Sequence, residues 1–151
     1  MHTRFERFSY SISQISYYWH KIAGEEMAVY GLKATCALYL LSMLQNEDGI
    51  TASGLCEQSG RDKADVSRAV SAMEKKGLLI RECSGNNLYR AVLRLTAEGK
   101  TAAEQVRQRA GLAVEIAGRD LTDQQRTVFY DALERIAENL QTMSKNGLPK
   151  E

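Results

Sequence analysis

The side chains of this sequence that could do chemistry are mostly basic, and they gather in one segment, residues 60–94. The segment has eight basic and four acidic side chains, a net charge of +4, whereas the rest of the 151-residue chain carries −3. The basic residues are Arg61, Lys63, Arg68, Lys75, Lys76, Arg81, Arg90 and Arg94. Guanidinium and ammonium groups gathered in this way neutralise the phosphates of a polyanion. The composition therefore favours a polyanion-binding module, although a solvated face of mixed charge would have the same composition.

Residues 62–76 are predicted to form a helix with one apolar and one polar side. At 100° per residue, the apolar side chains cluster at Val66, Ala69, Val70 and Met73. The opposite side presents Ala64, Ser67, Arg68, Ser71 and Lys75, with Lys63 at its edge. Small and hydroxyl residues allow close approach to a groove, whereas large apolar groups would obstruct it and acids would repel phosphate.

A short helix is predicted before this one, and the pair forms a helix-turn-helix pattern. Thr51 is expected to cap a helix that runs through Ser59, Gly60 supplies the turn, and Asp62 caps the helix that follows. In this motif the second helix enters the major groove of DNA. The sequence therefore predicts double-stranded DNA as the polyanion.

The chemistry of the side chains assigns each of them a role at the DNA. Arg68 can bind a guanine edge with both arms of its guanidinium, and Ser67 can bond to a base or a phosphate. Lys63 and Arg61 would neutralise backbone charge without reading sequence. The start of the short helix, with Ser53, would offer backbone amides to a phosphate.

One acidic side chain, Asp65, lies within this predicted interface. It follows Asp62 by three residues, so we expect it to complete the N-terminal cap and to interact favourably with the helix dipole. Alternatively, its carboxylate accepts a hydrogen bond from the amino group of a cytosine.

The segments on either side of the helix-turn-helix complete a predicted lobe. Before it, residues 32–45 form a helix that is apolar at Ala37, Leu38, Leu41 and Leu44. After it, residues 78–83 and 89–95 are predicted strands, and residues 84–87 have the composition of a turn. The fold class is therefore mainly α with a small β-hairpin.

Long helices with apolar stripes are predicted at both ends of the chain. The first ends near Gly24, the last begins with a capping box at Thr122 and Gln125 and stops at Gly147, and Thr96 caps a helix between them. This third helix has small residues at Ala103, Val106, Ala110, Ala113 and Ala117. The stripes of the terminal helices include Phe5, Phe8, Ile12, Ile15, Phe129, Leu133, Ile136 and Leu140. We expect a homodimer that interlocks the terminal helices, with a monomeric bundle as the alternative.

Several of these segments also resemble the multiple-antibiotic-resistance regulator (MarR) family. The resemblance lies in residues 51–56, 62–70, 73–81 and 95–99, including Glu-Lys-Lys-Gly-Leu at 74–78 and Leu-Thr-Ala-Glu-Gly at 95–99. It implies a single domain, 1–151, with a winged helix-turn-helix lobe at 32–96 and dimerisation helices at 1–24 and 97–146. It further implies a triangular dimer that represses transcription from a near-palindromic operator. In many members a small phenolic or amphipathic ligand, or thiol oxidation, releases the DNA.

The sequence departs from the family pattern in the hairpin, which would form the wing. The family usually carries an aspartate, any residue and then an arginine near the wing tip, where this chain has Asn87, Leu88 and Tyr89. Arg90 follows one position later, which places it on the opposite face of a strand. Either the wing is re-aimed and Arg90 enters the minor groove, or Asn87 and Tyr89 make weaker contacts. The candidate wing residues are Asn86, Asn87, Tyr89 and Arg90.

Two kinds of switch are considered for release. The effector cleft of the family lies where the dimer helices meet the lobe, so Tyr17, Tyr18, His20 and Tyr39 are candidates for binding a small aromatic ligand; alternatively they are core or interface residues. Oxidation would require an exposed thiol of lowered pKa. Cys36 and Cys56 are expected to be buried, which leaves Cys83 as the candidate.

Other classes of function lack the necessary residues. The sequence has no phosphate loop, nucleophile elbow or paired-histidine signature, so we expect no enzyme. Its two histidines, His2 and His20, show no zinc-ligand spacing, and we expect no metal or cofactor. No apolar run reaches the roughly 20 residues of a membrane span and no secretion signal is present, so a cytoplasmic protein is expected. The rival is a winged-helix adaptor for protein contacts without DNA binding.

Overall fold

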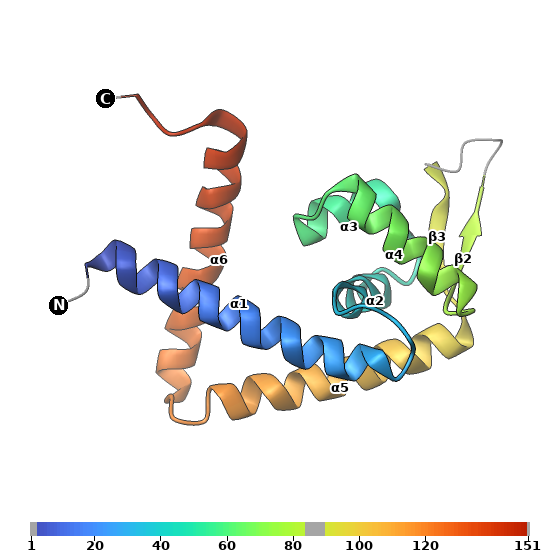
Figure 1. Cartoon of the computed structure of the whole chain (residues 1–151), viewed down its shortest axis with the longest axis horizontal. Coiled ribbons are helices and arrows are strands. Elements are labelled where there is room, and N and C mark those ends of the chain that lie inside the picture. The colour runs from blue at the N-terminus through green and yellow to red at the C-terminus, as the bar shows by residue number, and fades with distance from the viewer. Residues whose placement is uncertain (1–2, 84–89, 151) are drawn as a thin grey trace. The chain divides into compact units, whose positions relative to one another are not determined.

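The computed structural model describes residues 3–83 and 90–150 of the chain (Figure 1). Its helices are α1 (Arg4–Ala28), α2 (Thr35–Gln45), α3 (Ala52–Ser59), α4 (Lys63–Lys75), α5 (Ala97–Ala117) and α6 (Asp123–Asn146). Its strands are β1 (Ile50–Thr51), β2 (Leu79–Glu82) and β3 (Val92–Leu95). The fold class predicted from the sequence is confirmed. Asn86, Asn87 and Tyr89 of the predicted wing lie outside the described residues.

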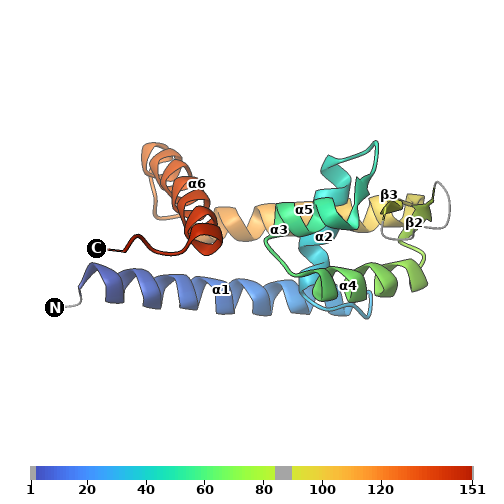
Figure 2. The same cartoon turned by 90° about the horizontal axis from the view of Figure 1, so that it is seen from above.

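The chain forms two compact units, residues 1–110 and 111–151. Helix α5 begins in the first unit and ends in the second. In the first unit the N-terminal half of α1 extends away from the other elements of that unit, as both views show (Figures 1 and 2). The division into a lobe and dimerisation helices stays a prediction.

Helix α2 forms the centre of the first unit, in contact with α1, α3, α4 and β3 (Figure 1). The buried residues of α2 are Cys36, Tyr39, Leu40, Ser42 and Met43. The apolar positions named from the sequence are on the less buried side, since Leu38 is 43% exposed and Ala37, Leu41 and Leu44 are partly buried. Because the helix is apolar on nearly every side, periodicity did not identify the face that enters the core.

The three strands form one antiparallel sheet in the order β1-β3-β2. Strand β2 pairs with β3 from Leu79 opposite Leu95 to Glu82 opposite Val92, which confirms the predicted hairpin with shorter strands. Strand β1 pairs with the other edge of β3, with Ile50 opposite Leu93. Strand β1 was not predicted, because two residues are too few to show the alternation of a strand.

The predicted caps of the helix-turn-helix are confirmed. The Thr51 hydroxyl accepts a hydrogen bond from the Gly54 amide at 3.1 Å, and the Asp62 carboxylate accepts one from the Asp65 amide at 2.7 Å. Gly60 ends α3 with a φ of +66°, a left-handed conformation that glycine adopts without a steric cost. These local contacts set where α4 begins and the direction from which the chain enters it.

The first turn of α5 is bound to the start of β2, which explains the Leu-Thr-x-x-Gly segment. The Thr96 hydroxyl donates to the Gly77 carbonyl at 2.6 Å and accepts from the Gly99 amide at 3.0 Å. A Cβ atom at Gly99 would lie 1.8 Å from the carbonyl oxygen of Leu78. Only glycine therefore fits at this point of contact.

The predicted end of the first helix is wrong. Helix α1 continues past Gly24 to Ala28, and the chain turns at Gly31, which has a φ of +66°. The extension brings Met27 into the core, where it is fully buried. An interior glycine costs about 1 kcal/mol relative to alanine, which is less than burial of a methionine side chain contributes.

The remaining helix predictions are confirmed or refined. Helix α6 begins with the predicted capping box, in which the Gln125 amide donates to Thr122 Oγ1 at 3.2 Å, and Gly147 follows its last residue. In α5, Ala103 and Val106 are buried in the first unit. These two small residues therefore serve the core of the chain itself.

Candidate nucleic-acid interface

Helix α4 presents two chemically different faces. Val66, Ala69, Val70 and Met73 are at most 7% exposed and belong to the core, as the sequence predicted. The predicted outward residues that are exposed are Lys63, Ala64, Ser67, Arg68 and Lys75. We call these five residues the outer face of α4. The outer face is small near its centre and cationic at its edges.

Ser71 does not belong to the outer face, which corrects the sequence-based expectation. It is partly buried, and its hydroxyl accepts a hydrogen bond from Nη2 of Arg81 at 3.2 Å. Nε of the same guanidinium forms an ion pair with Glu74 at 3.2 Å. Arg81 on β2 thus reaches back over the second half of α4, which the helical periodicity of α4 alone does not show.

The Asp65 side chain lies on the inner side of α4. It is partly buried, and its carboxylate accepts a hydrogen bond from the hydroxyl of Tyr39 on α2. Its backbone amide, not its carboxylate, takes part in the cap at Asp62. The Asp65 side chain therefore does not complete the cap, although it lies in the first turn of α4 as expected for an interaction with the helix dipole. The contact with cytosine stays a prediction.

Arg68 lies at one border of the outer face. It lines a pocket of about 220 Å³ between α4 and the turn that joins α1 to α2. Lys33 of that turn and Asp65 also line the pocket. Two cations, Arg68 and Lys33, therefore line one pocket at this border of the outer face.

The start of α3 has the features expected of a phosphate contact. Ser53 is exposed in the first turn of α3, and the Thr51 hydroxyl accepts a hydrogen bond from the Gly54 amide. Arg61 is exposed in the turn between α3 and α4. These residues and the first turn of α4 belong to the same helix-turn-helix.

The described part of the hairpin places one candidate wing residue. Arg90 is exposed just before Ala91, which is 1% exposed. Arg94 forms an ion pair with Glu82 across the β2–β3 pair at 2.8 Å. Among the described residues of the predicted wing, Arg90 is therefore an exposed cation, whereas Arg94 is paired within the sheet.

The four effector candidates are not brought together. Tyr17, Tyr18 and His20 are exposed on α1, where the two tyrosine rings meet edge to face with centroids 5.2 Å apart. Tyr39 is fully buried in the lobe and bonded to Asp65. The expectation that Tyr39 shares a cleft with the other three is therefore wrong for the single chain.

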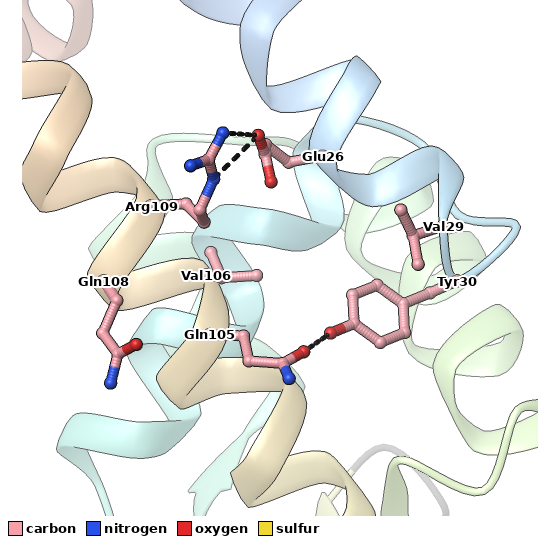
Figure 3. A pocket seen from close by; sticks show the side chains of 7 residues that line it. All are labelled: Glu26, Val29, Tyr30, Gln105, Val106, Gln108 and Arg109. Atoms are coloured by element: carbon pink, nitrogen blue, oxygen red, sulfur yellow. Dashed lines mark hydrogen bonds and ion pairs between the residues drawn. The ribbon is translucent and has the colours of Figure 1, made fainter.

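A pocket of about 300 Å³ lies between the end of α1, the turn after it, and α5 (Figure 3). On one side, Arg109 donates to a carboxylate oxygen of Glu26 from Nη2 at 3.0 Å and from Nε at 3.1 Å. This hydrogen-bonded ion pair raises the pKa of Arg109. On the other side, the Tyr30 hydroxyl donates to the side-chain oxygen of Gln105. The pocket is thus bordered by two polar links between α1 and α5, and Tyr30 is the only aromatic residue among those drawn.

The apolar stripes of the terminal helices are exposed in the single chain. On α1 the exposed members are Phe5, Phe8, Ile12, Ile15, Trp19 and Ile22. On α6, which has no buried residue, Phe129, Ile136 and Leu140 are exposed and Leu133 is partly buried. Exposed apolar surface of this extent marks an interaction site.

The cysteine predictions are confirmed for Cys36 and Cys83, whereas Cys56, expected to be buried, is only partly buried. Cys36 is buried, Cys56 is intermediate and Cys83 is exposed. Burial raises the pKa of the Cys36 thiol, which makes it a poor nucleophile. Within residues 3–83 and 90–150, no cluster of histidine, cysteine and acidic side chains could hold a metal ion. No helix of the same residues has the length and apolar character needed to cross a membrane.

Comparison with known proteins supports the resemblance seen in the sequence. Residues 30–86 match the sequence profile of the MarR family. A Thauera aromatica protein assigned as a transcriptional regulatory protein for the hcr operon is 26% identical over 103 residues, which are 68% of this chain and 62% of that protein. The match therefore spans less than two thirds of the length of that relative.

The fold is that of MarR-family structures. A Listeria monocytogenes protein assigned as a MarR-family regulator, crystallised with a 26mer DNA, superimposes with a TM-score of 0.83 at 23% identity, covering 100% of this chain and 99% of the other. A MarR regulator from Methanosarcina mazei gives a TM-score of 0.81 at 24% identity, covering 95% and 94%. Residues 30–86 thus match the MarR family in sequence, and the chain as a whole has the winged-helix fold of MarR-family structures.

Proposed function

We propose that this protein is a homodimeric transcription regulator that binds duplex DNA through the outer face of α4. The observation that carries the proposal is that Val66, Ala69, Val70 and Met73 bury one side of α4 while Ser67 and Arg68 stay exposed on the other. Side chains of this size let a helix reach the floor of the major groove, where an arginine can bind both acceptors of a guanine. The Listeria protein of the same fold was crystallised with a 26mer DNA, which supports duplex DNA as the partner.

The electrostatics of the helix-turn-helix support the same proposal. The three acids between residues 62 and 75 are all engaged, Asp62 with a backbone amide, Asp65 with Tyr39 and Glu74 with Arg81. Lys63, Arg61 and the start of α3 then provide cationic and amide groups for phosphates on either side of the groove. Arg90 is the candidate for a contact of the wing with the minor groove.

The exposed stripes of α1 and α6 support a homodimer. Both helices carry large apolar side chains, such as Ile15 at 56% exposure and Phe129 at 43%. A second copy of the chain presents the same stripes, so a two-fold arrangement can bury both sets at once. Two outer faces related by a two-fold axis would bind a near-palindromic operator, with half-sites about one helical turn apart.

We further propose that the protein represses transcription and that a ligand releases it from DNA, and both proposals rest on the family resemblance. Binding over a promoter would exclude polymerase, and a small aromatic or amphipathic molecule would release the DNA. Tyr17, Tyr18 and His20 remain the candidates on α1, where a dimer partner would supply the other side of a cleft.

The experiment that tests the proposal is selection from random duplexes, followed by affinity measurements on the selected sequence. The parent protein should enrich an inverted repeat and bind it with an affinity that falls steeply as salt concentration rises. Selection of no sequence, together with an affinity that does not change with salt, would instead support the adaptor without DNA binding.

A further inference from the structure

The interior of the lobe contains a polar contact between α2 and α4 that none of the roles above requires. Tyr39 lies in the middle of α2 and is fully buried, yet its hydroxyl donates to the carboxylate of Asp65 in the first turn of α4. Burial, and next the hydrogen bond to Asp65, raise the pKa of Tyr39, so the phenol keeps its proton and remains a donor.

The position of Asp65 gives this contact a consequence for DNA binding. Ala64 precedes it and Ser67 follows two residues later, both exposed on the outer face. The carboxylate is bonded on the opposite side, toward α2. The first turn of α4 is therefore held from two directions, by the Asp62 cap along the axis and by Tyr39 across it.

The residues that α2 and α4 contribute to their shared buried cluster are apolar, and they set only which side of α4 faces the core. The same buried cluster contains Cys36 and Leu40 from α2 and Val66 and Ala69 from α4. Apolar contacts depend on buried area and not on direction, whereas a hydrogen bond weakens steeply away from its preferred angle. The bond between Tyr39 and Asp65 therefore constrains the orientation of the first turn of α4, which is the turn that would contact the bases.

We propose that Tyr39 is a positioning residue for sequence-specific DNA binding, acting through Asp65 to set the rotation of α4 about its own axis. This inference rests on the proposed function of the outer face of α4. Tyr39 itself touches no DNA, and its effect is expected on base preference and not on the attraction to phosphate.

The test compares five proteins, the parent and four variants, on two duplexes: the sequence selected by the parent and a shuffled sequence of the same composition. The variants are Tyr39→Phe, which removes the donor, Asp65→Ala, which removes the acceptor, and Asp65→Asn, whose amide oxygen still accepts. Tyr130→Phe on α6, an exposed tyrosine, is the matched control. Circular dichroism first confirms that each variant is folded at the temperature of the binding measurements.

The quantity compared is the affinity for the selected duplex divided by the affinity for the shuffled duplex. Tyr39→Phe and Asp65→Ala should each lower this ratio about tenfold. Asp65→Asn and Tyr130→Phe should keep the ratio within about twofold, and Tyr39→Phe should leave shuffled affinity and its salt dependence unchanged. Because Asp65 is only partly buried, Asp65→Ala still tests the proposal if Tyr39→Phe does not fold.

Three results would overturn the proposal while leaving DNA binding intact. The first is a parent-like ratio in both Tyr39→Phe and Asp65→Ala. The second is an equal loss of selected and shuffled affinity in Tyr39→Phe, which would indicate repulsion by the released carboxylate. The third is a loss in Asp65→Asn as large as that in Asp65→Ala. Failure of the proposed function would appear separately, as failure of the parent protein to select any sequence.

Discussion

Nη2 of Arg81 donates a hydrogen bond to the hydroxyl of Ser71 at 3.2 Å, which connects strand β2 to the second half of α4. Because of this contact, the two serines on the polar side of α4 have different surroundings, and Ser71 is partly buried. Ser67, one turn earlier, is exposed. Only Ser67 is therefore free to face a DNA groove, although both serines lie on the polar side of the helix.

The two serines provide a matched pair for the first prediction. Ser67→Ala should weaken binding to the selected operator, because it removes a hydroxyl from the outer face of α4. Ser71→Ala should leave base preference unchanged and lower the free energy of unfolding by about 0.5–1.5 kcal/mol, since it removes one intramolecular hydrogen bond. Titration of labelled operator and urea unfolding measure the two effects. Loss of base preference in Ser71→Ala alone would contradict the assignment.

Arg68 and Lys63 are expected to contribute differently to DNA affinity. Arg68→Ala should cost about 1–3 kcal/mol of operator affinity and relax the preference at one position per half-site. Lys63→Ala should weaken binding to the selected and the shuffled duplex alike. The slope of log affinity against log salt concentration should become less steep by about one unit, the contribution of one phosphate contact. Competition titrations over a range of salt concentrations separate the two. If both variants bind as the parent does, α4 does not read the bases.

The exposed stripe of α1 predicts the oligomeric state. Ile12→Glu places a charge in the stripe and should shift the protein from dimer to monomer, because an unpaired carboxylate cannot be buried in an apolar interface at low cost. Operator affinity should fall with it, since one lobe binds one half-site. Gln14→Glu adds the same group about 200° around the helix and is the control. Sedimentation equilibrium gives the masses, and a dimer of Ile12→Glu would contradict the role assigned to the stripe.

Two glycines in α5 give a matched test of the contact between α5 and β2. Gly99→Ala should destabilise the protein by about 1–3 kcal/mol, because its Cβ would lie 1.8 Å from the Leu78 carbonyl oxygen. Gly111→Ala meets no atom within 4 Å and should be neutral or stabilising by up to about 1 kcal/mol. Thermal unfolding of both variants measures the difference. Equal melting temperatures would show that the backbone near Leu78 moves without cost.

The elements that could be predicted from the sequence are those defined by local chemistry. Thr51, Gly60, Asp62 and Gly77 mark helix boundaries through contacts within a few residues, so the helix-turn-helix was placed correctly. The core side of α4 followed from its periodicity because that helix is polar on one side and apolar on the other. Helix α2 lacks this contrast, and its buried face was not predicted.

The parts that could not be predicted depend on contacts between distant segments. Tyr39 and Asp65 are 26 residues apart, and Arg81 and Ser71 are 10 apart. No spacing rule of a single helix or strand connects such pairs. Sequence patterns alone therefore grouped Tyr39 with Tyr17 and Tyr18 and assigned Ser71 to the groove. Polar residues at unusual positions, such as an aspartate in a basic interface, were the available signal for such contacts.

The burial of Tyr39 predicts a loss of stability in alkaline solution. The folded protein holds the pKa of Tyr39 above its ordinary value of 10.0, so below that pH both states keep the proton and the stabilisation is fully present. As the pH rises beyond 10, the unfolded chain ionises while the folded phenol stays protonated. The free energy of unfolding should then fall by up to about 1.4 kcal/mol per pH unit from this group alone.

The variant Tyr39→Phe is needed to isolate the effect of this one group from every other effect of alkaline solution. It lacks the ionisable phenol but retains the buried ring. Urea unfolding of both proteins between about pH 8 and pH 11 should show the parent losing stability faster, with the difference between them narrowing above pH 10. Parallel curves over this range would mean that Tyr39 ionises equally in both states, and that its hydroxyl is not held in the buried bond to Asp65.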